Sequence, residues 1–117
     1  MFEIIQERDS DPPVVHLTGD LLLGTPTDSL VSLIQRLVAE GRADVIVQVS
    51  AIAAIDSTGL TALVTAHQTL KRAGGRLVLV QPSARLRTAL DRTRLISMFL
   101  VVENKADAVQ VLREPLR

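Results

Sequence analysis

The residues best suited to chemistry in this sequence are Asp56, Ser57 and Thr58, which end an apolar run and are followed by Gly59 and a new apolar pattern. Acids and hydroxyls in such a place commonly cap a helix, because their oxygens accept hydrogen bonds from the free amides of the first turn. We therefore expect Asp56 or Ser57 to be the N-cap of a helix. The same helix end presents unpaired N–H groups and the positive end of the helix dipole, so it also suits a phosphorylated serine.

A phosphate on Ser57 would change the surface around it. It would bring roughly −1.5 to −2 charges to a position beside Asp56, and close to Asp20 if the strand that ends there neighbours this loop. Such a negative cluster need not unfold the domain, but it would change which partner can dock. Gly59 has no side chain, and we expect it to let a partner's backbone or a nucleotide approach the first turn.

Catalysis by the chain itself is not supported by its sequence. A metal site needs several converging ligands, and the only two histidines, His16 and His67, lie in a strand pattern and on a helix stripe. A triad of Ser57, His67 and Asp56 fails on distance, because ten helical residues place Ser57 and His67 roughly 15 Å apart. The glycine pair at 74–75 follows a helix instead of preceding one, so it is not a phosphate-binding loop. We expect no enzyme activity, no metal and no bound cofactor.

The composition limits the class of protein further. A length of 117 residues, 47% hydrophobic content and a net charge of zero indicate a single domain, residues 1–117, without the basic patch of a nucleic-acid or membrane-surface protein. Aromatic residues make up only 2%, too few for stacking on single-stranded nucleic acid. The chain has no cysteine, no signal-peptide pattern and no apolar run near about 18 residues. We expect a cytoplasmic protein.

Polar and glycine-containing breaks divide the chain into strand and helix patterns. Residues 2–6 and 14–17 are short apolar segments around a proline-containing turn, which predicts an antiparallel hairpin. Thr25 before Pro26 predicts the N-cap and first position of a helix that ends at Gly41. The elements expected after it are strands at 45–49, 77–80 and 98–102, a helix after Ser57, a helix at 84–92 and a last helix capped by Asn104.

This alternation predicts an α/β fold. Strands that alternate with helices form a mostly parallel sheet, here with an antiparallel pair at the start and a cover of about four helices. The apolar stripe of the second helix is expected to consist of Leu60, Leu63, Val64 and His67.

These patterns resemble the STAS domain, the fold of bacterial anti-sigma factor antagonists, which are also called anti-anti-sigma factors. The most specific element is IDSTGL at 55–60, which is similar to the family's D-S-[ST]-G-L signature in register. The resemblance covers nearly the whole chain and includes TGDL at 18–21, VIVQVS at 45–50, KRAGGRLVLV at 71–80 and LRTALDRTRLISMF at 86–99. It implies a STAS fold, a mixed sheet covered by helices.

The resemblance also implies a partner switch that regulates transcription, for instance in a stress response. In the family, the unphosphorylated antagonist binds an anti-sigma factor with a GHKL-type serine kinase fold and thereby frees a sigma factor. The kinase phosphorylates the serine of the motif, here Ser57, which releases the kinase, and a metal-dependent serine phosphatase resets the switch. The chain would be a phosphoprotein and a binding module. The expected phosphosite-flanking and partner-binding residues are Asp20, Leu22, Thr25, Asp56, Thr58, Gly59 and Leu60.

Two positions depart from the family pattern. Leu22 stands where the second strand usually ends in an acid, and Gln48 replaces an acid in the strand before the motif. Both changes reduce the number of acidic side chains expected near Ser57. They leave a second hypothesis open, a constitutive interaction or scaffold domain, stressosome-like or transporter-associated, that is not switched at Ser57. An enzyme is the third hypothesis, and Thr58 is an alternative phosphoacceptor.

The partner surface is expected on the first turn of the Ser57 helix and on the loop from Leu22 to Thr25. Leu21, Leu22 and Leu23 are consecutive, and a strand buries only alternate residues on one face. Either at least one leucine is exposed and available to a partner, or the following helix covers all three. An exposed leucine would also allow a weak homo-oligomer.

Overall fold

The computed structural model describes residues 1–114, which contain a five-stranded sheet and four α-helices. In chain order the elements are β1 (Phe2–Gln6), β2 (Val14–Leu21), α1 (Thr25–Ala39), β3 (Val45–Ile55), α2 (Ser57–Arg72), β4 (Leu77–Val80), α3 (Ala84–Arg92), the 3-10 helix η1 (Ile96–Met98), β5 (Leu100–Val102) and α4 (Lys105–Arg113). The predicted order of strands and helices is confirmed. β2 and β3 are longer than expected, and η1 replaces the beginning of the predicted last strand.

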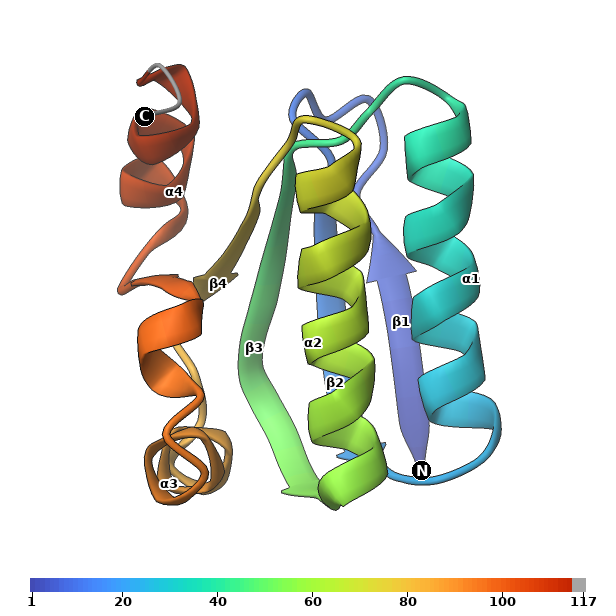
Figure 1. The fold of residues 1–117 in the computed structure, drawn as a ribbon, viewed down its shortest axis with the longest axis vertical. Coiled ribbons are helices and arrows are strands. Elements are labelled where there is room, and N and C mark those ends of the chain that lie inside the picture. Colours follow the sequence, from blue (N-terminus) through green and yellow to red (C-terminus); the bar gives the residue numbers. More distant parts are fainter. Residues whose placement is uncertain (115–117) are drawn as a thin grey trace.

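The strands lie in the order β1-β2-β3-β4-β5. β1 is antiparallel to β2, and every other neighbouring pair is parallel. The predicted α/β class, with its antiparallel pair at the start, is therefore confirmed. Figure 1 shows β1, β2 and β3 behind α1 and α2, with α3 and α4 beyond β4. Because the carboxyl ends of parallel strands meet at one edge of a sheet, this topology gathers the loops after β2 and β3.

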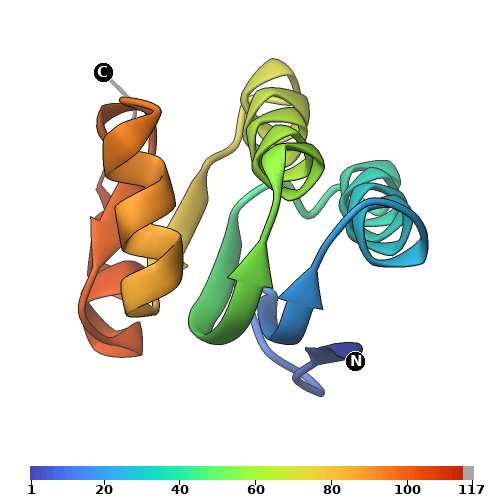
Figure 2. The same ribbon diagram turned by 90° about the horizontal axis from the view of Figure 1, so that it is seen from below.

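Both faces of the central strands are buried. Val45, Val47 and Val49 of β3 belong to the larger core, which α1, α2 and α3 cover, whereas Ile46 of β3 and Val78 of β4 face α4. Figure 2 shows α1 and α2 side by side on one side of the sheet. Burial on both sides explains why β3 begins as a nearly continuous β-branched run instead of an alternating pattern. Within residues 1–114, no helix is both long and apolar enough to span a bilayer.

The apolar faces of α1 and α3 are buried, whereas the buried face of α2 differs from the expected stripe. Leu30, Ile34 and Leu37 of α1, and Leu86 and Leu90 of α3, are all buried. On α2 the buried residues are Gly59, Ala62, Leu63, Ala66 and Leu70. Small side chains on this face let α2 pack closely against its neighbours, which leaves the expected Leu60, Val64 and His67 only half-buried at its edge.

The pairing of β2 with β3 contains two irregularities that shape the end of β3. His16 pairs with Gln48, but Thr18 pairs with Ala51, so β3 has one extra residue between these pairs. A second extra residue, Ala53, follows before Asp20 pairs with Ala54. Such bulges bend a strand and strengthen its twist. Both bulges lie in the second half of β3, shortly before the chain continues into α2.

Candidate functional site

The candidate site lies where two neighbouring parallel strands end. Asp20 pairs with Ala54 and Leu21 pairs with Ile55, so β2 and β3 finish side by side. Seen from this end, the arrowheads of the two strands lie next to each other, below the beginnings of α1 and α2 (Figure 2). This register brings Asp20, whose side chain is partly exposed, close to the loop that contains Asp56.

Asp56 connects the two loops with one carboxylate. It is the N-cap of α2, and its Oδ1 accepts a hydrogen bond from the backbone N–H of Gly59 at 2.8 Å. Its Oδ2 accepts a hydrogen bond from the backbone N–H of Leu23 at 3.0 Å. These N–H groups, that of Leu23 first, hold the pKa of Asp56 below its ordinary value of 3.8, because they stabilise the charged carboxylate. Of the two predicted caps, Asp56 and Ser57, the structure therefore selects Asp56.

Ser57 is the first residue of α2, and its side chain is exposed. Among residues 1–114 its hydroxyl has no hydrogen-bond partner, while its backbone carbonyl accepts a hydrogen bond from the Thr61 hydroxyl at 2.9 Å. Thr58 is half-buried, so Ser57 is the more accessible of the two candidate phosphoacceptors. A free hydroxyl at the positive end of a 16-residue helix can accept a phosphoryl group, whose charge the helix dipole would stabilise.

Gly59 packs inward, and the expectation that it leaves space for a partner is wrong. It is buried, and a Cβ at this position would overlap the carbonyl oxygen of Leu21 and crowd the side chain of Ile55. The absence of a side chain lets the first turn of α2 rest directly on the ends of β2 and β3. Leu60, the next residue, is half-buried and lines a groove towards α3.

The loop between β2 and α1 exposes two leucines beside this helix start. Leu21 is fully buried, whereas Leu22 is 37% exposed and Leu23 is 75% exposed. The hydrogen bond from the Leu23 amide to Asp56 holds this loop against the first turn of α2. Of the two alternatives left open by the sequence, the structure shows the one in which leucines are exposed. Leu23 lies within the loop from Leu22 to Thr25 that was expected to contact a partner, although only Leu22 and Thr25 of this loop were named as site residues.

The beginning of α1 differs from the prediction. Gly24, with a φ of 111°, occupies the N-cap position, and Thr25 is the first helical residue. No side chain caps the helix; instead, the Thr27 hydroxyl donates a hydrogen bond to the Gly24 carbonyl at 3.0 Å. The chain turns here through a positive φ, which glycine adopts readily, and the cap falls one residue earlier than expected. Thr25 remains exposed at the site.

Gln48 lies too far from Ser57 to influence it. It pairs with His16 in β2 and Val80 in β4, in the middle of the sheet. At about 3.3 Å per residue, β3 places it on the order of 20 Å from the start of α2. The expectation that Gln48 thins the acidic surroundings of Ser57 is therefore wrong. Of the two departures from the family pattern, only Leu22 lies at the site.

The two histidines lie away from this site. The Nε2 atom of His16 lies at hydrogen-bonding distance, 2.7 Å, from a carboxylate oxygen of Glu7. His67 packs against the ring of Phe99, with ring centroids 5.5 Å apart, and burial lowers the pKa of His67. Within residues 1–114, no three His, Cys, Asp or Glu side chains lie close enough together to hold a metal ion.

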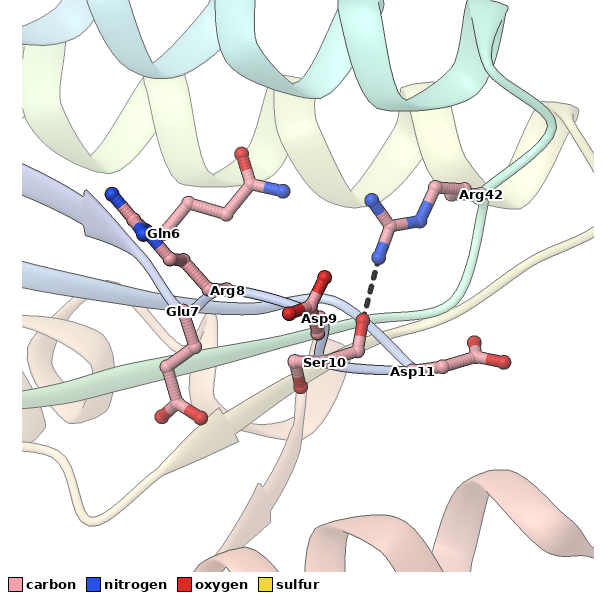
Figure 3. A pocket seen from close by; sticks show the side chains of 7 residues that line it. All are labelled: Gln6, Glu7, Arg8, Asp9, Ser10, Asp11 and Arg42. Atoms are coloured by element: carbon pink, nitrogen blue, oxygen red, sulfur yellow. Dashed lines mark hydrogen bonds between the residues drawn. The ribbon is translucent and has the colours of Figure 1, made fainter.

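A hollow surrounds the turn between β1 and β2, at the opposite end of the sheet from the start of α2 (Figures 1 and 3). Its volume is about 770 Å³, and the Arg42 guanidinium donates a hydrogen bond to the Ser10 carbonyl at 2.6 Å. Figure 3 shows the carboxylates of Glu7 and Asp11 pointing away from Arg42. Acids and arginines both line the hollow, so it does not select a ligand of one charge.

Comparison with known proteins assigns the chain to a family. A family model described as the STAS domain matches residues 3–108, which is most of the chain. The chain belongs to the STAS domain family. No curated protein sequence is a significant match.

Solved structures share the fold of this STAS domain. An anti-sigma factor antagonist from Mycobacterium paratuberculosis is 23% identical, with a TM-score of 0.79 over 97% of this chain and 96% of that one. The phosphorylated form of the Bacillus cell fate determinant SpoIIAA is 18% identical, with a TM-score of 0.73 over 95% of this chain and all of that one. A sulfate transporter family protein from Wolinella succinogenes is 23% identical, with a TM-score of 0.72 over 86% and 83% of the two chains. The same fold thus occurs in proteins of different roles.

Proposed function

We propose that this STAS domain is an anti-sigma factor antagonist that binds an anti-sigma factor serine kinase and is released when Ser57 is phosphorylated. The observation that carries the proposal is the exposed Ser57 hydroxyl at the start of α2, held by the Asp56 cap within the DSTGL motif. The likeness in fold to an anti-sigma factor antagonist and to SpoIIAA in its phosphorylated form supports it.

The partner surface consists of the first turn of α2 and the loop from Leu22 to Thr25. In the unphosphorylated chain, a neutral hydroxyl adjoins two exposed leucines, a combination that suits a largely apolar contact. Phosphorylation adds roughly −1.5 to −2 charges next to the Asp56 carboxylate. A partner that buries this surface would then have to desolvate the phosphate without an opposite charge, so its affinity falls.

The covalent step requires only a hydroxyl from this chain. The kinase transfers the γ-phosphoryl group of ATP to Ser57 Oγ, which forms phosphoserine and ADP, and the hydroxyl proton passes to a base of the kinase. A metal-dependent phosphatase restores the hydroxyl by hydrolysis. The STAS domain is therefore the substrate and the binding module, and the catalytic groups belong to its partners.

The test is a paired pull-down from native-host lysate with Ser57→Ala and Ser57→Asp as baits. We expect a kinase of the GHKL type to bind the alanine form and to be depleted at least about tenfold with the aspartate form, because Asp carries the negative charge permanently. Ser32→Asp, at an exposed serine of α1, is the matched control and should retain the kinase. Equal recovery of every partner by both Ser57 variants would contradict the switch.

The second candidate function is a constitutive interaction module. Leu22, an apolar residue at the site, and the likeness in fold to a sulfate transporter family protein favour it. In this case the leucines dock the partner and Ser57 carries no signal. The same pull-down separates the two functions, because a constitutive module retains its partner with both Ser57 variants and loses it when Leu23 is replaced by Asp.

A further inference from the structure

An open groove lies between α2 and α3, on the side of Ser57 away from the leucine loop. Its volume is about 520 Å³. Figure 1 shows α3 at the same end of the molecule as the start of α2, with the end of β3 between them. The apolar residues that line it are Ala54, Ile55, Leu60, Ala84 and Ala89, and the polar and charged residues are Arg85, Thr88, Arg92 and Thr93.

Two arginines flank the groove at helical spacing. Arg85 and Arg92 are seven residues apart on α3, so they lie on one face of the helix, two turns and roughly 10.5 Å from each other. Both are exposed, and neither forms an ion pair within residues 1–114. Arg87, between them in sequence, instead pairs with Glu103 at 3.3 Å. The groove thus combines apolar lining with two unneutralised guanidinium groups.

Around the groove, the excess of positive charge lies in α3 and the residues just after it. Residues 84–94 contain four arginines and one aspartate, although the whole chain has a net charge of zero. The groove therefore favours a negatively charged occupant through charge complementarity at one defined place. An exposed apolar groove with a rim of one charge sign is typical of an interaction site for a segment with apolar and oppositely charged side chains.

We propose that this groove docks an amphipathic helix of a partner protein, with apolar side chains in the groove and two carboxylates, seven residues apart, on Arg85 and Arg92. A helix repeats its geometry every two turns, so residues seven apart on the partner match the spacing of the two arginines. Each guanidinium can bind a carboxylate through two parallel N–H groups. The proposal does not depend on phosphorylation of Ser57, because none of its contacts uses that residue.

Other anionic occupants fit the groove less well. An anionic bilayer is recognised by a cluster of about four to eight basic residues, whereas Arg85 and Arg92 are the only basic residues that line this groove. Single-stranded nucleic acid is bound on aromatic platforms, and no aromatic residue lines the groove. A concave apolar surface with two spaced cations favours a protein helix.

The test uses two synthetic 16-residue helical peptides with the same apolar face, titrated into the ¹⁵N-labelled chain. The acidic peptide carries two Glu residues seven apart, and the other carries Lys at those positions. We expect the NMR chemical shifts of the backbone amides of Ala54, Leu60 and Ala89 to change saturably with the acidic peptide. The lysine peptide should not change them. The double variant Arg85→Glu/Arg92→Glu should weaken binding at least about tenfold, and a peptide with its two Glu residues four apart should bind more weakly.

The control is Arg72→Glu/Arg113→Glu, which changes the net charge equally at exposed arginines outside the groove. It should leave the affinity within about twofold of the wild-type value. Three results would overturn the proposal: no saturable shift in the groove, equal binding of the two peptides, or unchanged affinity in the Arg85/Arg92 variant. Shifts of the groove amides with phosphatidylglycerol vesicles, in the absence of any response to the acidic peptide, would assign the groove to a lipid instead.

Discussion

At the residue scale, Asp56 shows how one carboxylate can order two loops. Its oxygens accept hydrogen bonds from the backbone of its own helix and from Leu23, thirty-three residues earlier in the chain. Hydrogen bonds to a charged carboxylate are shorter and stronger than those between neutral groups. The backbone of the exposed leucine loop is therefore held against the first turn of α2, the turn in which Ser57 lies.

The stabilisation by Asp56 should depend on pH. Because the pKa of Asp56 is lowered in the folded chain, its stabilisation is fully present above the ordinary value of 3.8 and is lost as the pH falls through the lower folded-state value. Asp56→Asn keeps a capping oxygen but has no charge to lose. The urea midpoint of the wild type should exceed that of Asp56→Asn at about pH 7, and the two midpoints should converge as the pH falls below the folded-state pKa of Asp56.

Asp28→Asn is the control for this experiment. Asp28 is an exposed acid in the first turn of α1, and within residues 1–114 its carboxylate accepts no hydrogen bond. The Asp28→Asn substitution should therefore change the urea midpoint only slightly at every pH. A difference between wild type and Asp56→Asn that stays constant from neutral to acid pH would show that the charge of Asp56 does not stabilise the fold.

Gly59 makes the second prediction at this scale. Gly59→Ala gains about 1 kcal/mol of helix propensity, but its new methyl group would overlap the Leu21 carbonyl oxygen, a backbone atom that cannot swing away. Overpacking of this kind typically costs about 1–3 kcal/mol. We expect a net decrease in the free energy of unfolding, measured in urea, whereas Gln68→Ala at an exposed position of α2 should be neutral or stabilising. A Gly59→Ala variant as stable as wild type would contradict the close packing.

At the scale of elements, the loop between β2 and α1 is the part of the site with the greatest apolar exposure. Under the proposed function, Leu23→Asp should weaken binding of the anti-sigma factor at least about tenfold, because an unpaired carboxylate buried in an apolar contact loses its hydration without a compensating partner. The free energy of unfolding should change by no more than about 0.5 kcal/mol, since the side chain is 75% exposed. Calorimetric titration with the purified partner and urea unfolding measure the two quantities.

Ile5→Asp provides the matched substitution. Ile5 is 52% exposed on β1, a strand that does not take part in the candidate site. It should leave the affinity for the partner unchanged. If Ile5→Asp and Leu23→Asp weaken binding equally, the partner does not dock specifically on the leucine loop.

The elements were predicted wherever local periodicity determines them. The inward faces of α1 and α3 follow from apolar residues at helical spacing, and Asn104 caps α4 as expected, with its side chain accepting from the Asp107 amide. The second half of β3 was missed because residues 50–54 are mostly small and lack a β-branched run. Their extended conformation comes from pairing with β2 across two bulges, and this information is not local.

The candidate site was predicted in part for the same reason. Asp56 and Ser57 could be identified from the motif, because capping depends on neighbouring residues. The Asp56 to Leu23 hydrogen bond and the inward packing of Gly59 both require β2 to lie beside β3. The distance of Gln48 from Ser57 likewise follows from the length and register of β3, which the sequence did not reveal.

At the scale of the whole molecule, α4 is the only α-helix within residues 1–114 that covers the face of the sheet opposite to α1, α2 and α3. Arg76 binds the end of this helix. The two Nη groups of Arg76, just before β4, donate hydrogen bonds to the backbone carbonyls of Val111 at 3.2 Å and Leu112 at 2.9 Å. Carbonyls in the last turn of a helix lack the usual partner four residues on, and here the Val111 carbonyl also accepts a hydrogen bond from the Glu114 amide at 3.2 Å. Arg76 therefore caps α4 and keeps it on Ile46 and Val78.

Arg76→Ala should loosen α4 while leaving the Ser57 site intact. Loss of two hydrogen bonds from a mostly buried charged group should lower the free energy of unfolding by about 1–3 kcal/mol, because the Leu112 carbonyl loses the Arg76 donor and the Val111 carbonyl keeps only the Glu114 amide. Amide exchange should accelerate in α4 but not at Leu23 or Gly59, which lie at the opposite end of β3. Arg76→Lys keeps the positive charge but lacks the planar guanidinium with its two Nη donors. Its free energy of unfolding and its exchange rates in α4 should lie between those of the wild type and those of Arg76→Ala. Unchanged exchange in α4 of Arg76→Ala would mean that apolar packing around Ala108 alone holds the helix, and that the second face of the sheet needs no polar anchor.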